Sequence, residues 1–230
     1  MTHKKFVLTA IRALFHFLIA VVTFAVWLHM VFRPVSGAFL VTNGLATLKF
    51  YTVLSNLLNG AASAVLCAEL VLILRGKRGA VSRGAFLLNY VGTAAVAVTF
   101  LVVLCFLGPA VGHALLYHDA NFWFHLVLPV FSIAEFLVLE RDHRITFRQM
   151  LLVCIPPLLY GLGYLINLLI NGIGGAWPNS NDFYGFAAHG IPAGLVIFAV
   201  IVLIAWLCGL LLALPCRKRK NLDRISPKPL

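Results

Sequence analysis

Six long apolar stretches constrain the fold of this chain more than any other feature of its sequence. A helix needs about 20 predominantly apolar residues to cross the hydrocarbon core of a bilayer. The stretches that meet this requirement are Phe6–Val31, Phe50–Leu74, Ala85–Leu107, Phe122–Leu139, Met150–Ile170 and Gly190–Leu214. They are continuous rather than alternating, so they do not match the strands of a membrane β-barrel. The sequence therefore predicts an all-α, polytopic membrane protein built as a six-transmembrane-helix bundle.

Composition supports this class and bounds the number of domains. Only 11% of the 230 residues are charged, whereas soluble domains average about 25%. The first apolar stretch is longer than the roughly 7–15 residues of a signal-peptide core, so we expect it to remain as the first helix. The length fits one bundle, and we expect a single transmembrane domain over residues 1–216 followed by a basic cytoplasmic tail over 217–230.

The basic residues predict the orientation of the bundle. Of the 18 Lys and Arg residues, all but Arg33 and Lys49 lie at the termini or in the connections on the same side as the termini. Basic residues accumulate in cytoplasmic connections, so both termini are expected in the cytoplasm. Stop-transfer and contact with anionic lipid headgroups explain the "RKRK" tail more simply than nucleic-acid binding does, and no nucleic-acid partner is expected.

Polar residues interrupt the second apolar stretch, in "FYTVLSNLLNG". Thr52, Ser55, Asn56 and Asn59 follow one another at i, i+3, i+4 and i+7, which places all four on one helical face. Such a face is expected to look into the bundle or a wet cavity, because polar groups facing lipid are costly. Two interpretations stay open. Either the side chains form interhelical hydrogen bonds, worth roughly 0.6 kcal/mol each, or they line a functional pocket.

The fifth apolar stretch carries a similar pattern. Tyr160, Tyr164, Asn167 and Asn171 share one face, and this helix runs in the direction opposite to the second. The two polar faces should therefore converge in the outer half of the membrane, which predicts an outward-opening pocket. The candidates to line it, or to stabilise an oxyanion in it, are Ser55, Asn56, Asn59, Tyr164, Asn167 and His189.

A threonine and a histidine are expected at the same depth in that outer half. Thr52 lies three residues past Lys49, and His125 lies about four residues into the fourth helix, which runs in the same direction. At 1.5 Å per residue, both lie roughly 4.5–6 Å into the membrane. A hydroxyl and an imidazole at one depth are suited to act as nucleophile and general base. The alternative is that His125 is packed, or hydrogen bonded to a loop.

Other titratable residues give weaker signals. His29, His113, His118 and His189 gather on the outer side near Asp119, but their spacing matches no specific metal motif. No metal and no cofactor is therefore expected. Two acidic residues, Glu69 and Glu135, lie toward the inner ends of their helices. They either pair with basic residues there or belong to a proton path.

Three segments resemble a known family. "LKFYTVLSNLLNG", "FHLVLPVFSIAEFLVLE" and "AWPNSNDFYGF", in this order, are similar to segments of the androgen-induced membrane hydrolases, which act on fatty acid esters of hydroxy fatty acids. The resemblance covers most of the chain. "TVLSN" and "NDFYGF" look more like the bacterial six-helix branch, which implies an integral protein of a bacterial plasma membrane.

The resemblance implies a function. It makes Thr52 the nucleophile and His125 the base of a lipid-ester hydrolase, with a lipid as the substrate and with Asn56 or Asn167 as candidate oxyanion donors. No acidic partner of His125 is evident. A non-enzymatic lipid-binding or transport protein that uses the same pocket is the alternative, and a structural membrane protein with a packed polar core is a third interpretation.

Overall fold

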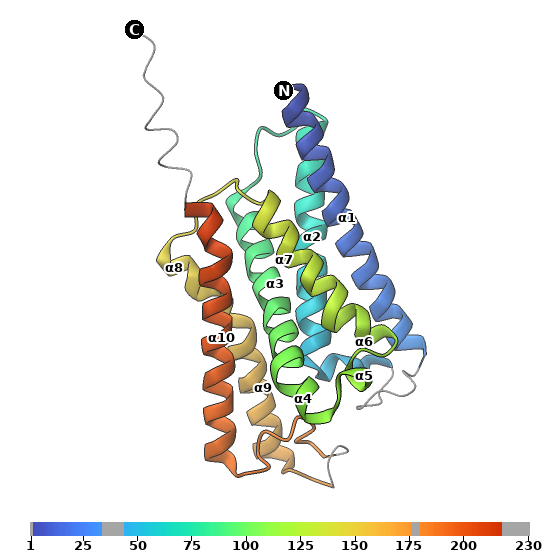
Figure 1. The fold of residues 1–230 in the computed structure, drawn as a ribbon, viewed down its shortest axis with the longest axis vertical. Coiled ribbons are helices and arrows are strands. Elements are labelled where there is room, and N and C mark those ends of the chain that lie inside the picture. The colour runs from blue at the N-terminus through green and yellow to red at the C-terminus, as the bar shows by residue number, and fades with distance from the viewer. Residues whose placement is uncertain (1, 34–43, 176–179, 218–230) are drawn as a thin grey trace.

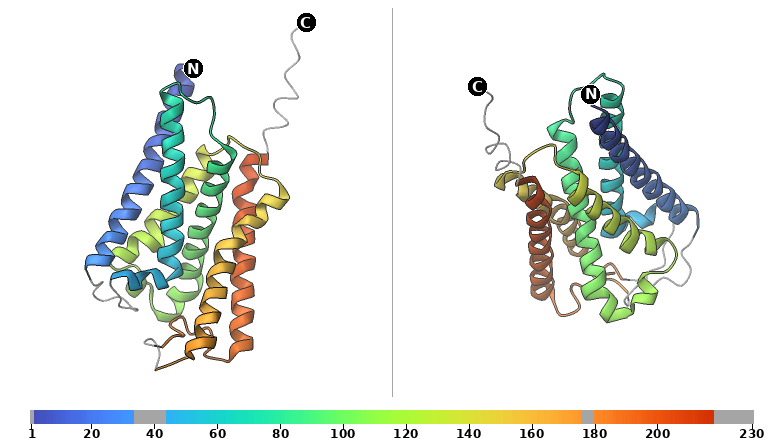
Figure 2. Two further views of the ribbon diagram at one scale, coloured as in Figure 1. Left: turned by 180° about the vertical axis from the view of Figure 1, so that it is seen from behind. Right: turned by 45° about the horizontal axis from the view of Figure 1, so that its top comes forward.

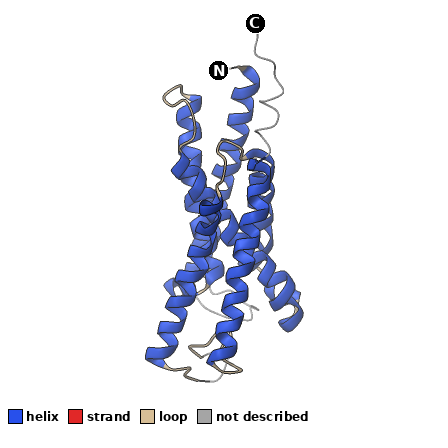
Figure 3. Ribbon diagram, turned by 90° about the vertical axis from the view of Figure 1, so that its left-hand side faces the viewer, coloured by secondary structure: helices blue, strands red, loops and turns tan. Residues whose placement is uncertain are grey.

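The structure is a computed structural model that describes residues 2–33, 44–175 and 180–217. Regular secondary structure in these residues is entirely helical (Figure 3). The α-helices are α1 (His3–Phe32), α2 (Tyr51–Leu74), α3 (Arg83–Val102), α4 (Gly108–Val111), α5 (His113–Leu116), α6 (Ala120–Phe122), α7 (Leu128–Leu139), α8 (Phe147–Met150), α9 (Ile155–Asn171) and α10 (Ile191–Arg217).

Six continuous helical stretches in the described residues are long and apolar enough to cross a membrane. They run over His3–Phe32, Tyr51–Leu74, Arg83–Val111, Ala120–Leu139, Phe147–Asn171 and Ile191–Cys216. Each coincides with one of the apolar stretches of the sequence, so the prediction of a six-helix all-α membrane fold is confirmed at this level. Residues 218–230 of the predicted basic tail lie outside the described residues.

The six stretches alternate in direction. The start of α1 and the end of α10 lie at the same end of the bundle (Figure 1), which we name the terminal end; the other is the opposite end. α1 packs along α2 and α2 along α3, while α7 crosses this layer. α9 and α10 lie together on the other side of α3 (Figure 2). Both α2 and the stretch containing α7 start at the opposite end, as their expected parallel course requires.

Prolines explain where the long helices depart from α-helical geometry. Residues Val103–Leu107 and Trp123–Val127 form π-helical turns, and Pro109 and Pro129 follow them closely. Proline has no N–H and its ring clashes with the carbonyl four residues earlier; for Pro129 that carbonyl belongs to His125. The α-helical ladder therefore cannot continue through these positions, and a wider turn carries the chain past them.

Most of the predicted polar face of α2 forms hydrogen bonds between helices. The Ser55 and Thr99 hydroxyls lie 2.8 Å apart, and Asn59 Nδ2 donates to Ser132 Oγ at 2.8 Å. Gly92 of α3 permits this close packing, because a Cβ there would lie 2.9 Å from the Asn59 Cα. These bonds fix α2 against α3 and α7 and so hold the first turn of α2 in place.

Candidate functional site

A cavity of about 410 Å³ lies at the side of α2 that faces α3, α9 and α10. Its volume falls within the roughly 300–1,000 Å³ of small-molecule sites. Most of the lining is aliphatic or aromatic, and it includes Thr52, Thr99, Tyr160 and Tyr164. The lining residue Leu159 is 66% exposed on the lateral surface of the bundle, so the cavity reaches the surface that would face lipid. A ligand that enters this cavity from the lipid side must be largely apolar, as an acyl chain is.

Tyr184 holds the first turn of α2, where Thr52 lies. The residue before this helix, Phe50, provides no side-chain cap, and the first amides of a helix have no partner within it. The Tyr184 hydroxyl accepts a hydrogen bond from the Tyr51 amide at 3.1 Å and also interacts with Thr52. Burial raises the pKa of Tyr184 to about 12. Tyr184 therefore stays protonated at neutral pH and orders the turn that presents Thr52 to the cavity.

The connection that carries Tyr184 is itself anchored to α9. Tyr164 Oη donates to Asp182 Oδ1 at 2.7 Å and accepts from the Tyr184 amide at 3.2 Å. The other oxygen of this buried carboxylate accepts from the Ala187 amide at 2.9 Å. Tyr164 and Asp182 therefore fold residues 182–187 over the opposite end of the cavity.

His125 is buried in the π-helical turn before α7, and its tautomer is fixed by its partner. Nδ1 lies 2.5 Å from the carbonyl oxygen of Leu116. Because a carbonyl only accepts, Nδ1 carries the proton, and Nε2 of the neutral ring has a free lone pair. This is the arrangement a general base needs, with a backbone carbonyl rather than a carboxylate as the orienting group.

Asn56 joins the two helices that carry Thr52 and His125. Leu128 N–H bonds to the Trp123 carbonyl, so the next carbonyl, that of Phe124, would need an N–H from Pro129, which has none. Asn56 Nδ2 supplies it, donating to Phe124 O at 3.1 Å and to Thr52 O at 2.8 Å. Both of its N–H groups are thus engaged, so in this structure Asn56 has no free N–H to serve as the oxyanion donor that the sequence suggested.

The structure separates the other predicted site residues. Thr52 and Tyr164 line the cavity; His125 does not, and none of the described hydrogen bonds joins it to Thr52. The remaining candidates also lie outside the lining. Ser55 and Asn59 form hydrogen bonds between helices, Asn167 accepts a hydrogen bond from Asn171, and His189 is exposed.

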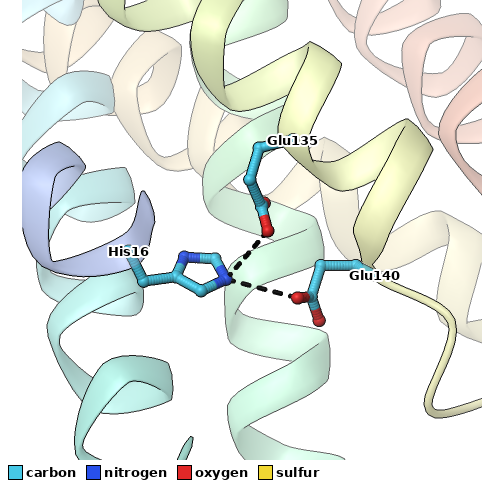
Figure 4. A group of neighbouring side chains, drawn as sticks. All are labelled: His16, Glu135 and Glu140. Carbon is cyan, nitrogen blue, oxygen red and sulfur yellow. Dashed lines mark hydrogen bonds and ion pairs between the residues drawn. The ribbon is translucent and has the colours of Figure 1, made fainter. Parts of the chain in front are cut away.

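A second polar cluster lies near the terminal end, between α1 and the end of α7. His16 Nε2 faces Glu135 Oε1 at 3.2 Å and Glu140 Oε1 at 3.3 Å (Figure 4). Arg12 donates from Nε and Nη2 to the two oxygens of Glu140, at 2.8 and 2.7 Å, and also pairs with Asp142. His16 and Glu140 are fully buried, and Glu135 is 6% exposed.

Electrostatics keep Glu140 ionised in this cluster. Burial by itself would raise the pKa of this carboxyl, but hydrogen bonds from His16 and Arg12 lower it to about 2. His16, Glu135 and Glu140 are, among the described residues, the group whose ligand atoms lie close enough together to hold a metal ion. The outer histidines behave otherwise: His29, for example, lies 3.6 Å from Asp119 in an exposed pair.

The sequence indicated only one member of this cluster. It placed Glu135 toward the inner end of its helix, and the structure shows that its facing group is His16. The signal that identifies the others is the i, i+4 spacing of Arg12 and His16 inside an apolar helix, because ionisable residues within a span require buried partners.

Comparison with known proteins finds no family model, no curated protein and no solved structure that matches this chain.

Proposed function

We propose that this protein hydrolyses a lipid ester in the membrane, with Thr52 as the nucleophile and His125 as the general base. The observation that carries the proposal is the double hydrogen bond of Asn56, which ties the turn of Thr52 to the residue before His125. The catalytic threonine and histidine that the family resemblance implies are therefore on two segments in direct contact. The cavity beside Thr52 offers room for an acyl chain and opens toward lipid.

The chemistry follows from the groups present. His125 Nε2 takes the proton of Thr52 Oγ1, and the oxygen attacks the ester carbonyl. The ester C–O bond then breaks, and the alcohol leaves with the proton from His125. Water, deprotonated by His125, attacks the acyl-threonine; the acid is released and Thr52 recovers its proton. The two side chains approach each other when substrate binds, as catalytic hydrogen bonds often tighten only in the complex.

An oxyanion donor is required, and Tyr51 is the best candidate. Tyr51 is one of the residues that line the cavity, and its buried hydroxyl makes no hydrogen bond to the described residues. A free, desolvated donor beside the nucleophile is the arrangement that stabilises developing negative charge. Removing one such donor typically lowers kcat by about 10²–10³-fold.

The positive-inside pattern orients the site. The terminal end carries most of the basic residues and is assigned to the cytoplasm of a bacterial plasma membrane, with anionic headgroups at the basic tail. The opposite end, with Thr52 near it, then faces outward. Water reaches the ester carbonyl from that side, while the acyl chain stays in apolar surroundings.

A panel of lipid esters tests the proposal with purified protein in nanodiscs. Thr52→Ala and His125→Ala should each abolish hydrolysis, and the double variant should lose little more, because residues acting as one unit are non-additive. Tyr51→Phe should lower kcat by about 10²-fold. Thr23→Ala, at a buried threonine outside the cavity lining, and Tyr117→Phe, at another tyrosine hydroxyl without a hydrogen bond to the described residues, are the matched controls and should stay active.

Lipid binding or transport without chemistry is the second candidate function. It is favoured by the position of His125 outside the cavity lining. In proteoliposomes this function predicts uptake or transfer of an intact lipid ester at equal rates by wild type and Thr52→Ala. Cleavage that depends on Thr52 and His125 would exclude it as the main activity.

A further inference from the structure

We infer that His16, Glu135 and Glu140 form a binding site for a divalent transition-metal ion such as Zn²⁺ at the terminal end of the bundle. The spacing of the three side chains is the first argument. Metal–nitrogen and metal–oxygen distances of about 2.0–2.2 Å in a tetrahedral site place neighbouring ligand atoms roughly 3.3–3.5 Å apart. His16 Nε2 lies 3.2 Å from Glu135 Oε1 and 3.3 Å from Glu140 Oε1, so an ion fits between them after small movements.

The charge of the cluster is the second argument. Arg12 pairs with both Glu140 and Asp142, of which Asp142 is exposed, while Glu135 faces the imidazole of His16. Two buried carboxylates, those of Glu135 and Glu140, therefore meet at one imidazole. Buried charge requires a partner, and a divalent cation between the three groups supplies one.

Glu135 supplies an independent observation. Its side chain is 6% exposed and points at His16 (Figure 4), yet its Oε1 forms no hydrogen bond. An unsatisfied buried oxygen in a native structure points to a water or ion beside it. Glu135 Oε1 lies 3.2 Å from His16 Nε2, and all three ligand atoms lie within 4.8 Å of one another, so an ion between them would satisfy it.

Arg12 completes the arrangement by holding one of the ligands in place. Ligating carboxylates are commonly held by hydrogen bonds that fix their orientation. Arg12 holds both oxygens of Glu140, at 2.8 and 2.7 Å, and aims Oε1 at His16. The ion would add a link between α1 and the end of α7. Imidazole with two carboxylates suits Zn²⁺ or Mn²⁺ better than Ca²⁺.

The test uses the untagged full chain in nanodiscs, stripped with a chelator and dialysed against Zn²⁺. We expect one zinc ion per chain by elemental mass spectrometry, and a thermal midpoint that rises with zinc concentration. Glu135→Gln should weaken zinc binding by at least about tenfold. Glu69→Gln is the matched control, because it removes a carboxylate that is paired with Arg78 and Ser82 instead.

Co²⁺ gives a readout that needs no variant. Bound by the wild-type chain, it should show the intense visible absorption of a tetrahedral site, and added Zn²⁺ should remove that absorption. Zinc retention no higher in wild type than in Glu135→Gln, or a Co²⁺ spectrum equal to that of the aqueous ion, would overturn the inference. Either result would indicate that His16 and the two carboxylates share a proton and do not bind a metal ion.

Discussion

The Tyr184 hydroxyl accepts a hydrogen bond from the backbone amide of Tyr51 at 3.1 Å, and so the last connection on the opposite end caps the helix that carries Thr52. Tyr184→Phe removes this acceptor and leaves the amide unpartnered. We expect a loss of about 1 kcal/mol in the free energy of unfolding and a lower kcat for the proposed hydrolysis, because Thr52 loses its support. Thermal unfolding and ester turnover measure the two effects. Tyr117→Phe should change neither.

The same tyrosine predicts a loss of stability at alkaline pH. Burial raises the pKa of Tyr184 to about 12, above its ordinary value of about 10. A group with a raised pKa stabilises the fold below its unfolded pKa, and this contribution disappears as the pH rises toward the folded value. The stability of wild type should therefore fall more steeply than that of Tyr184→Phe between about pH 10 and pH 12. Parallel curves for the two proteins would contradict this assignment.

The pair between Arg12 and Glu140 should dominate the stability of the terminal end. Arg12→Ala leaves a fully buried carboxylate without its guanidinium, a change that costs about 3–5 kcal/mol. Arg78→Ala breaks the pair with Glu69, in which the Arg78 side chain is 40% exposed, and should cost about 0–1 kcal/mol. Unfolding in mixed micelles compares the two variants. If Arg12→Ala does not fold, Arg12→Lys can be used instead, because it keeps the charge and loses only the bidentate geometry. Equal losses in the free energy of unfolding for the Arg12 and Arg78 variants would contradict the prediction.

The proposed orientation of the bundle predicts opposite labelling of two exposed connections. In a variant without the five native cysteines, a cysteine at His118 should react with an impermeant maleimide in intact cells. A cysteine at Lys77 should react only after permeabilisation, because its connection carries basic residues of the cytoplasmic side. The reverse pattern would place the cavity mouth in the cytoplasm.

The helical framework was predictable because the length of an apolar run determines whether it can span a bilayer. The polar face of α2 was also visible in the spacing of Ser55 and Asn59. Of the two interpretations of that face, the structure favours interhelical hydrogen bonds for these two residues. The role of Asn56 was not visible, since it depends on a carbonyl of Phe124 that Pro129 leaves unpaired.

Lateral contacts between distant segments were beyond the sequence. Thr52 and His125 could be assigned the same depth from their distance to the nearest connections. Depth does not determine the direction in which each side chain points around its helix axis. Likewise Arg12 and Glu140 are separated by 128 positions, and no local pattern links them. Only the packing of α1 against α7 identifies the partners of Arg12 and His16.

The most direct measurement is mass spectrometry of the protein after brief incubation with an activated long-chain ester, quenched in acid. If Thr52 is the nucleophile, the peptide that contains it should carry the acyl group. The adduct should disappear in Thr52→Ala and form much more slowly in His125→Ala, while Thr23→Ala should resemble wild type. Hydrolysis of the same ester at the full wild-type rate by Thr52→Ala, with no adduct on the wild-type peptide, would contradict the proposed mechanism.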